Sequence, residues 1–580
     1  MKKFIITFLL ILIGNQTVVF SQESTPIYYQ KVLKERIFVH YNTSFALSGE
    51  SLLYKVYCIR DRTNQLSTLS KVAYIELIDA RGKRVFKNKL RLDNGVSNGS
   101  FNIPNTTASG NYKLIAYTEW MRNEGTDYFF KGTISIINTI QKNQGFNVKS
   151  TVKSKMPIVA SSQANSTLND IKEVKDQFKL VLKQQEYAKR QKVQLNVEGL
   201  DKSALLGNYS VSVRKVNTFK KGVKPTSKTY VFNYPNNTIA PKSKAHFLPE
   251  FKGDLLKGIV LHKETGIPVS NVRIALSVPN KKFKFRFATT DKKGVFEFMF
   301  KTAHEDSEAV VQILDVKKEM YKLVMVDQES LKYEGLTFNE IEITPKGKEE
   351  LLAYNIQNQI EKSYATSKQK TKLKTLTDDL FNKSSTYLLD DYNRFATVKE
   401  TVIEIVKSVR IINRNGKYKF FVRNSDRFDE VKELPLVIMD GVFIQNHDEI
   451  MDFNASKVKS ISVVREKYVY ESYIFQGIIF IETFKGDYKN DEISDYMKNV
   501  QFDVPSNNNG FYKQQYLDAS FDRIPDYRRQ LAWLPMLNLQ AEENKVDFYT
   551  SDIVGDFEIS LEGFTQKGIP VSLKEFFSVK

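Results

Sequence analysis

The chain has 580 residues, of which 41% are hydrophobic and 26% charged, and it carries a formal net charge of +19 with a single cysteine. This composition is typical of folded globular domains, and the length suffices for about four or five of them. One cysteine excludes an internal disulfide, so packing alone must hold each domain. Aromatic residues make up 12% of the chain, mostly Phe and Tyr, and this surplus favours strands.

The first residues predict an export signal. Lys2 and Lys3 precede an apolar run that ends at Ile13, and the small residue Ser21 comes before Gln22. A basic start, a short apolar stretch and a small residue at the cut are the parts of a secretory signal peptide, here residues 1–21. The run is too short to span a membrane, and no later stretch is longer, so we expect an exported protein without an embedded segment. Export disfavours nucleic acid as the partner of the basic chain.

Residues 24–140 alternate apolar and polar positions between turns, which predicts an all-β sandwich. Cys58 lies in one of these strand-like runs, where we expect a small buried apolar side chain. The order of the segments resembles the macroglobulin-type domain. The matching segments are residues 45–57 with Gly49 and Glu50, the strands beginning at Gly99 and Gly110, and the end near Trp120.

Residues 141–172 are polar and aperiodic, and we expect a linker there. A second macroglobulin-like sandwich is expected over residues 173–245, from the strand-like runs 187–197 and 209–214. The thioester of that family has no counterpart, because Cys58 lacks its motif. Residues 246–345 resemble the carboxypeptidase-regulatory-like sandwich, on the runs 256–260, 265–269, 272–276 and 290–298. In that family these residues shape the scaffold and catalyse nothing.

The pattern changes after Gly347. Residues 348–363 and 392–409 carry apolar side chains at helical spacing and predict two amphipathic helices. The run 434–439 then meets Asp440 and Gly441, and apolar residues resume, which is the strongest short-range hairpin signal. Strands are expected at 457–464 and 477–483. We place an α+β domain over residues 346–495 and a further β-sandwich over 496–580.

The hairpin and the two strands after it follow the order of the plug domain of TonB-dependent outer-membrane receptors. The resemblance accounts for the apolar hairpin, since a plug-type sheet is buried on both faces, and residues 392–409 are a candidate cover. The residues after Asp487 are too few for a receptor barrel, which needs well over roughly 200. The domain combination resembles a group of exported Bacteroidota proteins, among them the plug subunit of the type 9 secretion translocon. This implies a periplasmic protein docked on an outer-membrane β-barrel that another chain supplies.

The fold class expected is therefore mainly β and multidomain, with tandem Ig-like sandwiches and a small plug-like α+β domain. No metal-ligand spacing, nucleophile elbow or phosphate-binding loop occurs, so we expect no enzyme, cofactor or metal. Our hypothesis is a non-catalytic accessory that plugs or scaffolds a β-barrel, and the alternative is a surface adhesin or glycan-binding protein. The candidate partner-binding residues lie in the hairpin, in the loop 445–449 after it, which we expect to be exposed, and in an aromatic segment: Asp440, Gly441, Gln445, His447, Tyr468, Tyr470 and Tyr473. Exposed tyrosines would be interface anchors, and burial within the chain is the alternative for them.

Overall fold

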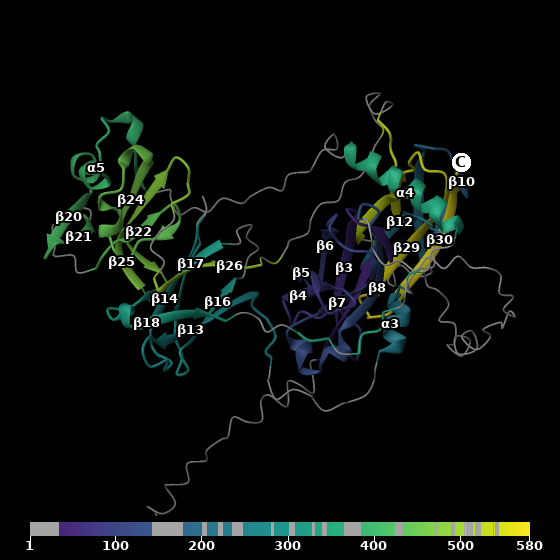
Figure 1. The fold of residues 1–580 in the computed structure, drawn as a ribbon, viewed down its shortest axis with the longest axis horizontal. Coiled ribbons are helices and arrows are strands. Elements are labelled where there is room, and N and C mark those ends of the chain that lie inside the picture. The colour runs from purple at the N-terminus through teal and green to yellow at the C-terminus, as the bar shows by residue number, and fades with distance from the viewer. Residues whose placement is uncertain are drawn as a thin grey trace, which may run out of the picture.

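The chain is mainly β and multidomain, and in Figure 1 the first and last parts of the chain share one lobe while the middle of the chain forms the other. The computed structural model describes residues 34–141, 178–199, 206–217, 224–234, 247–279, 284–300, 308–326, 331–333, 335–338, 341, 345–364, 384–423, 433–470, 473–488, 494–503, 505, 514, 516, 524–537, 539 and 544–580. The expected signal segment 1–21 and residues 142–172 of the expected linker lie outside this description. Within it, no helix combines the length and apolar character needed to cross a membrane.

The β-sandwich expected over residues 24–140 is present as the first sandwich. One sheet has the order β1(Glu35–Tyr41), β3(Ser51–Arg60), β6(Val96–Asn102). The other has the order β2(Phe45–Leu47), β8(Phe130–Ile137), β7(Gly110–Tyr117), β4(Val72–Ile78), β5(Arg84–Arg91). Cys58 is fully buried in the shared core, as its apolar surroundings predicted.

The second sandwich is built from two parts of the chain that lie far apart in sequence. One sheet has the order β10(Glu186–Tyr187), β30(Pro570–Val579), β29(Gly555–Thr565), β12(Gly207–Lys215), β27(Gln530–Leu537). The other has the order β28(Lys545–Tyr549), β11(Lys192–Gly199), β9(Phe178–Leu182). The separate sandwiches expected at 173–245 and 496–580 are therefore one domain. Strands of both parts pair within each of the two sheets, and their side chains form one shared core.

A third sandwich interrupts the second one between β12 and β27. Its sheets have the orders β16(Val295–Phe300), β13(Asp254–His262), β18(Tyr321–Met325) and β15(Lys284–Thr289), β14(Arg273–Val278), β17(Glu308–Leu314), β26(Met497–Gln501). These strands cover the residues that resemble the carboxypeptidase-regulatory-like domain. The last strand, β26, comes from beyond the expected boundary at residue 345, because the α+β domain is itself inserted between β18 and β26.

The α+β domain, called the module below, is a five-stranded sheet with helices on one face. The strand order is β19(Ser385–Leu388), β24(Val458–Tyr470), β25(Tyr473–Thr483), β22(Leu436–Met439), β23(Val442–Phe443). Helices α5(Val398–Glu404) and α6(Asp448–Met451) and the hairpin of β20(Val409–Arg414) and β21(Lys417–Val422) complete it. The three plug-resembling segments thus form neighbouring strands of one sheet, with β22 parallel to β25. The expected cover over 392–409 is confirmed in part: Val398 and Val402 of α5 pack on the sheet, but the helix ends at Glu404 and Val409 already belongs to β20.

The helix expected at 348–363 is confirmed as α4(Pro345–Ser363), but it lies on the other lobe, against the first and second sandwiches. Its Tyr354 is fully buried beside Phe45 and Leu47 of the first sandwich. The expected grouping of this helix with the module over 346–495 therefore differs from the structure. Helical spacing identifies an apolar stripe without identifying the surface that buries it. A short helix, α3(Ser227–Asn233), packs on the same lobe. Single 3-10 turns occur at Trp120–Asn123, Thr126–Tyr128, Lys318–Met320, Leu389–Asp391 and Ala455–Lys457.

Candidate partner-binding site

Asp440 and Gly441 form the tight turn between β22 and β23. Their φ angles are +48° and +86°, which suits an Asp-Gly hairpin turn. The Asp440 carboxylate accepts hydrogen bonds from the Thr483 amide at 2.8 Å, the Thr483 hydroxyl at 2.6 Å and the Tyr488 amide at 3.0 Å. It is buried. The predicted hairpin is confirmed, and its aspartate ties the turn to the end of β25.

The loop after the hairpin contacts the rest of the chain more than an exposed loop would. His447 is buried, and its Nδ1 accepts the Phe420 amide at 2.9 Å. Burial, and next the charge of Lys419, lower the pKa of His447 to about 4, so the ring is neutral at physiological pH. Gln445 accepts a hydrogen bond from Lys318 of the third sandwich at 2.7 Å. The expectation of an open loop over 445–449 therefore holds only for Asn446 and Glu449, which are exposed.

The aromatic segment faces the third sandwich. Tyr473 stacks on Phe287 of β15, with ring centroids 3.7 Å apart and planes at 26°. Tyr468 and Phe475 pack against the same apolar cluster. The side chain of Tyr470 lies outside the described residues. Tyr468 and Tyr473 therefore pack within the chain, and a contact of these tyrosines with a partner stays a prediction.

A sheet-on-sheet interface joins the module to the third sandwich. Leu436 and Ile438 of β22 are buried against Phe285 and Phe287 of β15. Two buried hydrogen bonds cross the interface, from Gln312 to the Phe443 carbonyl at 2.9 Å and from the Phe443 amide to the Ser277 hydroxyl at 3.1 Å. Both faces of the apolar hairpin are thus covered, one by α5 and α6 and the other by a neighbouring sandwich. The plug resemblance implies helices on both faces of the sheet, but in the structure a sheet of the third sandwich covers one face.

The segment that leaves the first lobe is clamped to the first sandwich around Glu250. The Tyr74 hydroxyl donates to the two carboxylate oxygens of Glu250 at 2.9 and 3.0 Å, and the Lys71 amide donates to the Glu250 carbonyl at 2.9 Å. Lys89 pairs with Asp254 at 3.1 Å. Burial, and next the charge of Glu119, raise the pKa of Glu250 to about 8. The carboxyl group is therefore protonated at neutral pH in the folded protein.

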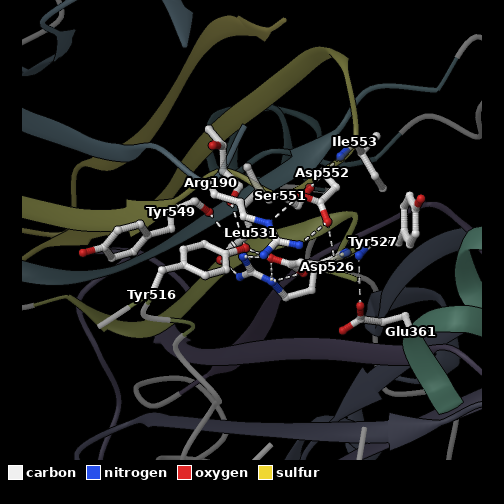
Figure 2. A network of polar contacts seen from close by, with 12 residues as sticks. Arg190, Glu361, Tyr516, Asp526, Tyr527, Leu531, Tyr549, Ser551, Asp552 and Ile553 are labelled. Carbon is white, nitrogen blue, oxygen red and sulfur yellow. Dashed lines mark hydrogen bonds and ion pairs between the residues drawn. The ribbon is translucent and has the colours of Figure 1, made fainter. Parts of the chain in front are cut away.

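The return of the chain into the second sandwich is fixed by a second polar cluster, shown in Figure 2. The Arg528 guanidinium donates to Asp526, with Nη2 and Oδ2 2.6 Å apart, and Arg190 donates to Asp552 through Nε and Nη2, each bond 2.7 Å long. The Asp526 amide joins the two pairs by donating to Asp552 at 2.8 Å. Figure 2 also shows Glu361 of α4 accepting the amide hydrogen of the residue after Asp526, at 3.2 Å. This cluster holds together parts of the chain on either side of the insertion.

Between the first two sandwiches lies a buried lysine. Lys55 is fully buried, and its Nζ donates to the Tyr209 carbonyl at 3.1 Å and lies 4.6 Å from the centre of the Tyr57 ring. Burial lowers the pKa of Lys55 to about 7. A partly neutral amine is a nucleophile in principle, but this one has no access to solvent. We assign it to the packing of the two sandwiches.

No group of three or more His, Cys, Asp and Glu side chains suited to a metal occurs among the described residues. His40 is buried between the first two sandwiches, His262 is partly buried on β13, and His246 and His304 lie outside the described residues. The polar clusters described above bind other parts of the same chain. They position domains, and none presents an exposed reactive group.

Sequence reasoning missed the outward face of the β20–β21 hairpin, where four cations are exposed: Arg410, Arg414, Lys417 and Lys419. The signal was present as alternating Arg and Lys around Asn415 and Gly416, a second hairpin motif. Helical and strand periodicity are recognised from apolar residues and so identify the buried face of an element. The exposed, charged face of a short hairpin therefore gives no periodic signal.

No protein-family model and no curated protein matches this chain. Among solved structures, it is similar to Salmonella alpha-2-macroglobulin reacted with methylamine, at 9% identity and a TM-score of 0.23 over 94% of this chain and 40% of that one. It is also similar to trypsin-activated alpha-2-macroglobulin from Escherichia coli, at 9% identity and a TM-score of 0.22 over 94% and 41%. The Escherichia coli adhesin FdeC is similar at 9% identity and a TM-score of 0.14 over 48% and 60%. The chain thus spans about two fifths of the alpha-2-macroglobulin structures.

Proposed function

We propose that this chain is a non-catalytic exported scaffold that presents the module to an outer-membrane β-barrel and plugs or supports that barrel from the periplasmic side. The observation that carries the proposal is the nested insertion. The module lies between β18 and β26 of the third sandwich, and that sandwich lies between β12 and β27 of the second. Each insertion leaves and returns through strands of its host. A rigid scaffold that displays one small domain is the arrangement expected of a docking protein.

The barrel partner follows from the plug resemblance of the module. The strands that follow the module, β26 to β30, complete sheets of the third and second sandwiches. In this proposal the barrel is a separate protein, and the translocon of type 9 secretion is one candidate. The periplasmic location rests on the signal peptide expected at residues 1–21.

The packing of the module limits the surfaces that are open to a partner. The face toward the third sandwich is buried, so docking uses a surface of the module that stays exposed. The end of the β24–β25 hairpin carries Val469 and Ile474, a directly paired apolar couple with 64% and 52% of their surfaces exposed. They lie on the strand face opposite to Tyr468 and Tyr473, because successive side chains in a strand alternate between faces. An exposed apolar pair at a hairpin end is a suitable anchor for a partner protein.

Affinity capture from gently solubilised outer membranes tests the proposal. A tag after Lys580 would be used to isolate the full chain, and a barrel protein in near-stoichiometric amount is the expected result. Replacing Val469 and Ile474 together by Glu should abolish the capture, whereas Phe576→Glu, at an exposed position on β30 of the other lobe, should not. Capture of polysaccharide or soluble material alone, together with cleavage of the chain by protease added to intact cells, would instead support the adhesin alternative.

A further inference from the structure

The β20–β21 hairpin has one face packed on the module and one face in solvent. Val409, Phe420 and Val422 are buried in the core of the module. Because successive side chains in a strand point to opposite faces, the residues between them form the outer face. That face comprises Arg410, Ile412, Arg414, Lys417, Lys419 and Phe421. In Figure 1 the hairpin lies at the end of its lobe, away from the first two sandwiches.

The turn places like charges directly opposite each other. Asn415 and Gly416 have φ angles of +54° and +79°, and this tight turn pairs Arg414 with Lys417 across the strands. Like charges in such a position destabilise a hairpin. Within the described part of the chain, no side-chain hydrogen bond or ion pair holds any of the four cations. The carboxylate of Asp448 contacts the hairpin, but it accepts the Tyr418 backbone amide at 2.6 Å.

The outer face therefore retains a repulsive charge cluster that does nothing for the fold. Its cations surround two half-buried apolar side chains, Ile412 and Phe421. Long, unrestrained cations around an apolar centre match an anionic bilayer, whose charged headgroups cover an apolar interior. Recognition of one acidic peptide would instead call for arginines held in place by other side chains. The net charge of +19 adds a long-range attraction between the whole chain and an anionic surface.

We propose that the outer face of the β20–β21 hairpin is a membrane-surface site that binds the anionic headgroups of a phospholipid bilayer. The site requires no barrel, so it is separable from the proposed function. It would orient the module toward the membrane before any protein partner is engaged.

The test uses the full chain without its signal segment. The nine residues that follow Arg423 carry three carboxylates and two cations, and the full chain keeps their charge in the measurement. Binding is measured to vesicles of phosphatidylcholine alone and of phosphatidylcholine with about one third phosphatidylglycerol, at physiological salt. The wild-type chain is expected to bind the anionic vesicles and not the neutral ones. Binding should weaken as salt rises, because exposed charges are screened.

The fourfold variant R410Q/R414Q/K417Q/K419Q should weaken this binding by on the order of a hundredfold or more, since each such cation contributes roughly a factor of five at a membrane surface. A matched variant, K292Q/K293Q/K317Q/K322Q, removes the same charge from exposed positions on the third sandwich and should change binding less than about threefold. Equal effects of the two variants would overturn the assignment to the hairpin. Failure of the wild type to bind anionic vesicles, with retention on immobilised polyglutamate, would overturn the choice of a bilayer in favour of an acidic protein.

Discussion

Removing the ring of Phe287 should detach the module from the third sandwich. Phe287 is 8% exposed and stacks on Tyr473 at 3.7 Å, within the cluster that also buries Leu436 and Ile438. Truncating a buried phenylalanine costs about 3 to 5 kcal/mol, of which an aromatic pair supplies about 0.5 to 1.5. Because this ring lies between two domains that have cores of their own, we expect the cost to fall on the interface, at about 3 kcal/mol.

Hydrogen exchange followed by mass spectrometry measures this cost locally, which suits a multidomain chain whose unfolding is not two-state. In Phe287→Ala, peptides covering Phe443, whose amide donates across the interface to Ser277, should exchange faster by on the order of a hundredfold, since about 1.4 kcal/mol corresponds to a factor of ten. The matched change Phe576→Ala removes a ring that is 49% exposed on β30 and should leave these peptides unchanged. Wild-type exchange of the Phe443 amide in Phe287→Ala would refute the packing described here.

Three further predictions concern single charged groups. Because the pKa of Glu250 is raised to about 8, its contribution to stability is complete below about pH 4.5 and is lost as the pH rises through 8, with a slope of up to about 1.4 kcal/mol per pH unit. Glu250→Gln keeps the acceptor for Tyr74 and should flatten this decline of the unfolding free energy, measured by denaturant titrations at pH 5 and pH 9. An unchanged decline would contradict the role of Glu250 in the clamp. Asp440→Ala should destabilise the module by about 2 to 4 kcal/mol, and Asp440→Asn by less, because Asn keeps one acceptor and tolerates positive φ. Equal losses of the two variants in urea unfolding would argue against the hydrogen bonds of Asp440 to Thr483. Lys417→Glu creates an ion pair with Arg414, so it should raise the stability of the hairpin by about 0.5 to 1 kcal/mol while weakening vesicle binding, and a change of both in the same direction would count against the membrane site.

The sequence identifies local structure here and leaves long-range pairing open. The Asp440–Gly441 turn was predicted correctly because it depends on a few neighbouring residues. Helix α5 was predicted in place but too long, because the apolar residues after Glu404 continue into β20. The union of β12 with β27 and β29 was not predicted, since hundreds of residues separate the strands and alternation does not say which strands pair. The same limit explains why the partner surface was placed at Tyr468 and Tyr473. Their exposure depends on β15, whose Phe287 comes from a different domain.

The candidate site also shows what a motif can and cannot give. His447 follows a turn, which favours a solvated loop, but its ring is buried because the β21 backbone offers it an amide. The order of the residues in β20 and β21 shows that basic side chains flank a hairpin turn. Only the register of the hairpin shows that its cations share one face and that two of them stand directly opposite.

Site-specific cross-linking in cells tests the central claim most directly, namely that the module is the part of this chain that meets a β-barrel. A photoreactive amino acid would replace Val469 at the end of the β24–β25 hairpin or, as the matched position, Phe576 on β30 of the other lobe. The account predicts a strong cross-link from position 469 to one outer-membrane barrel protein and none from position 576. A cross-link from position 576 alone, or none to any barrel from position 469, would contradict it.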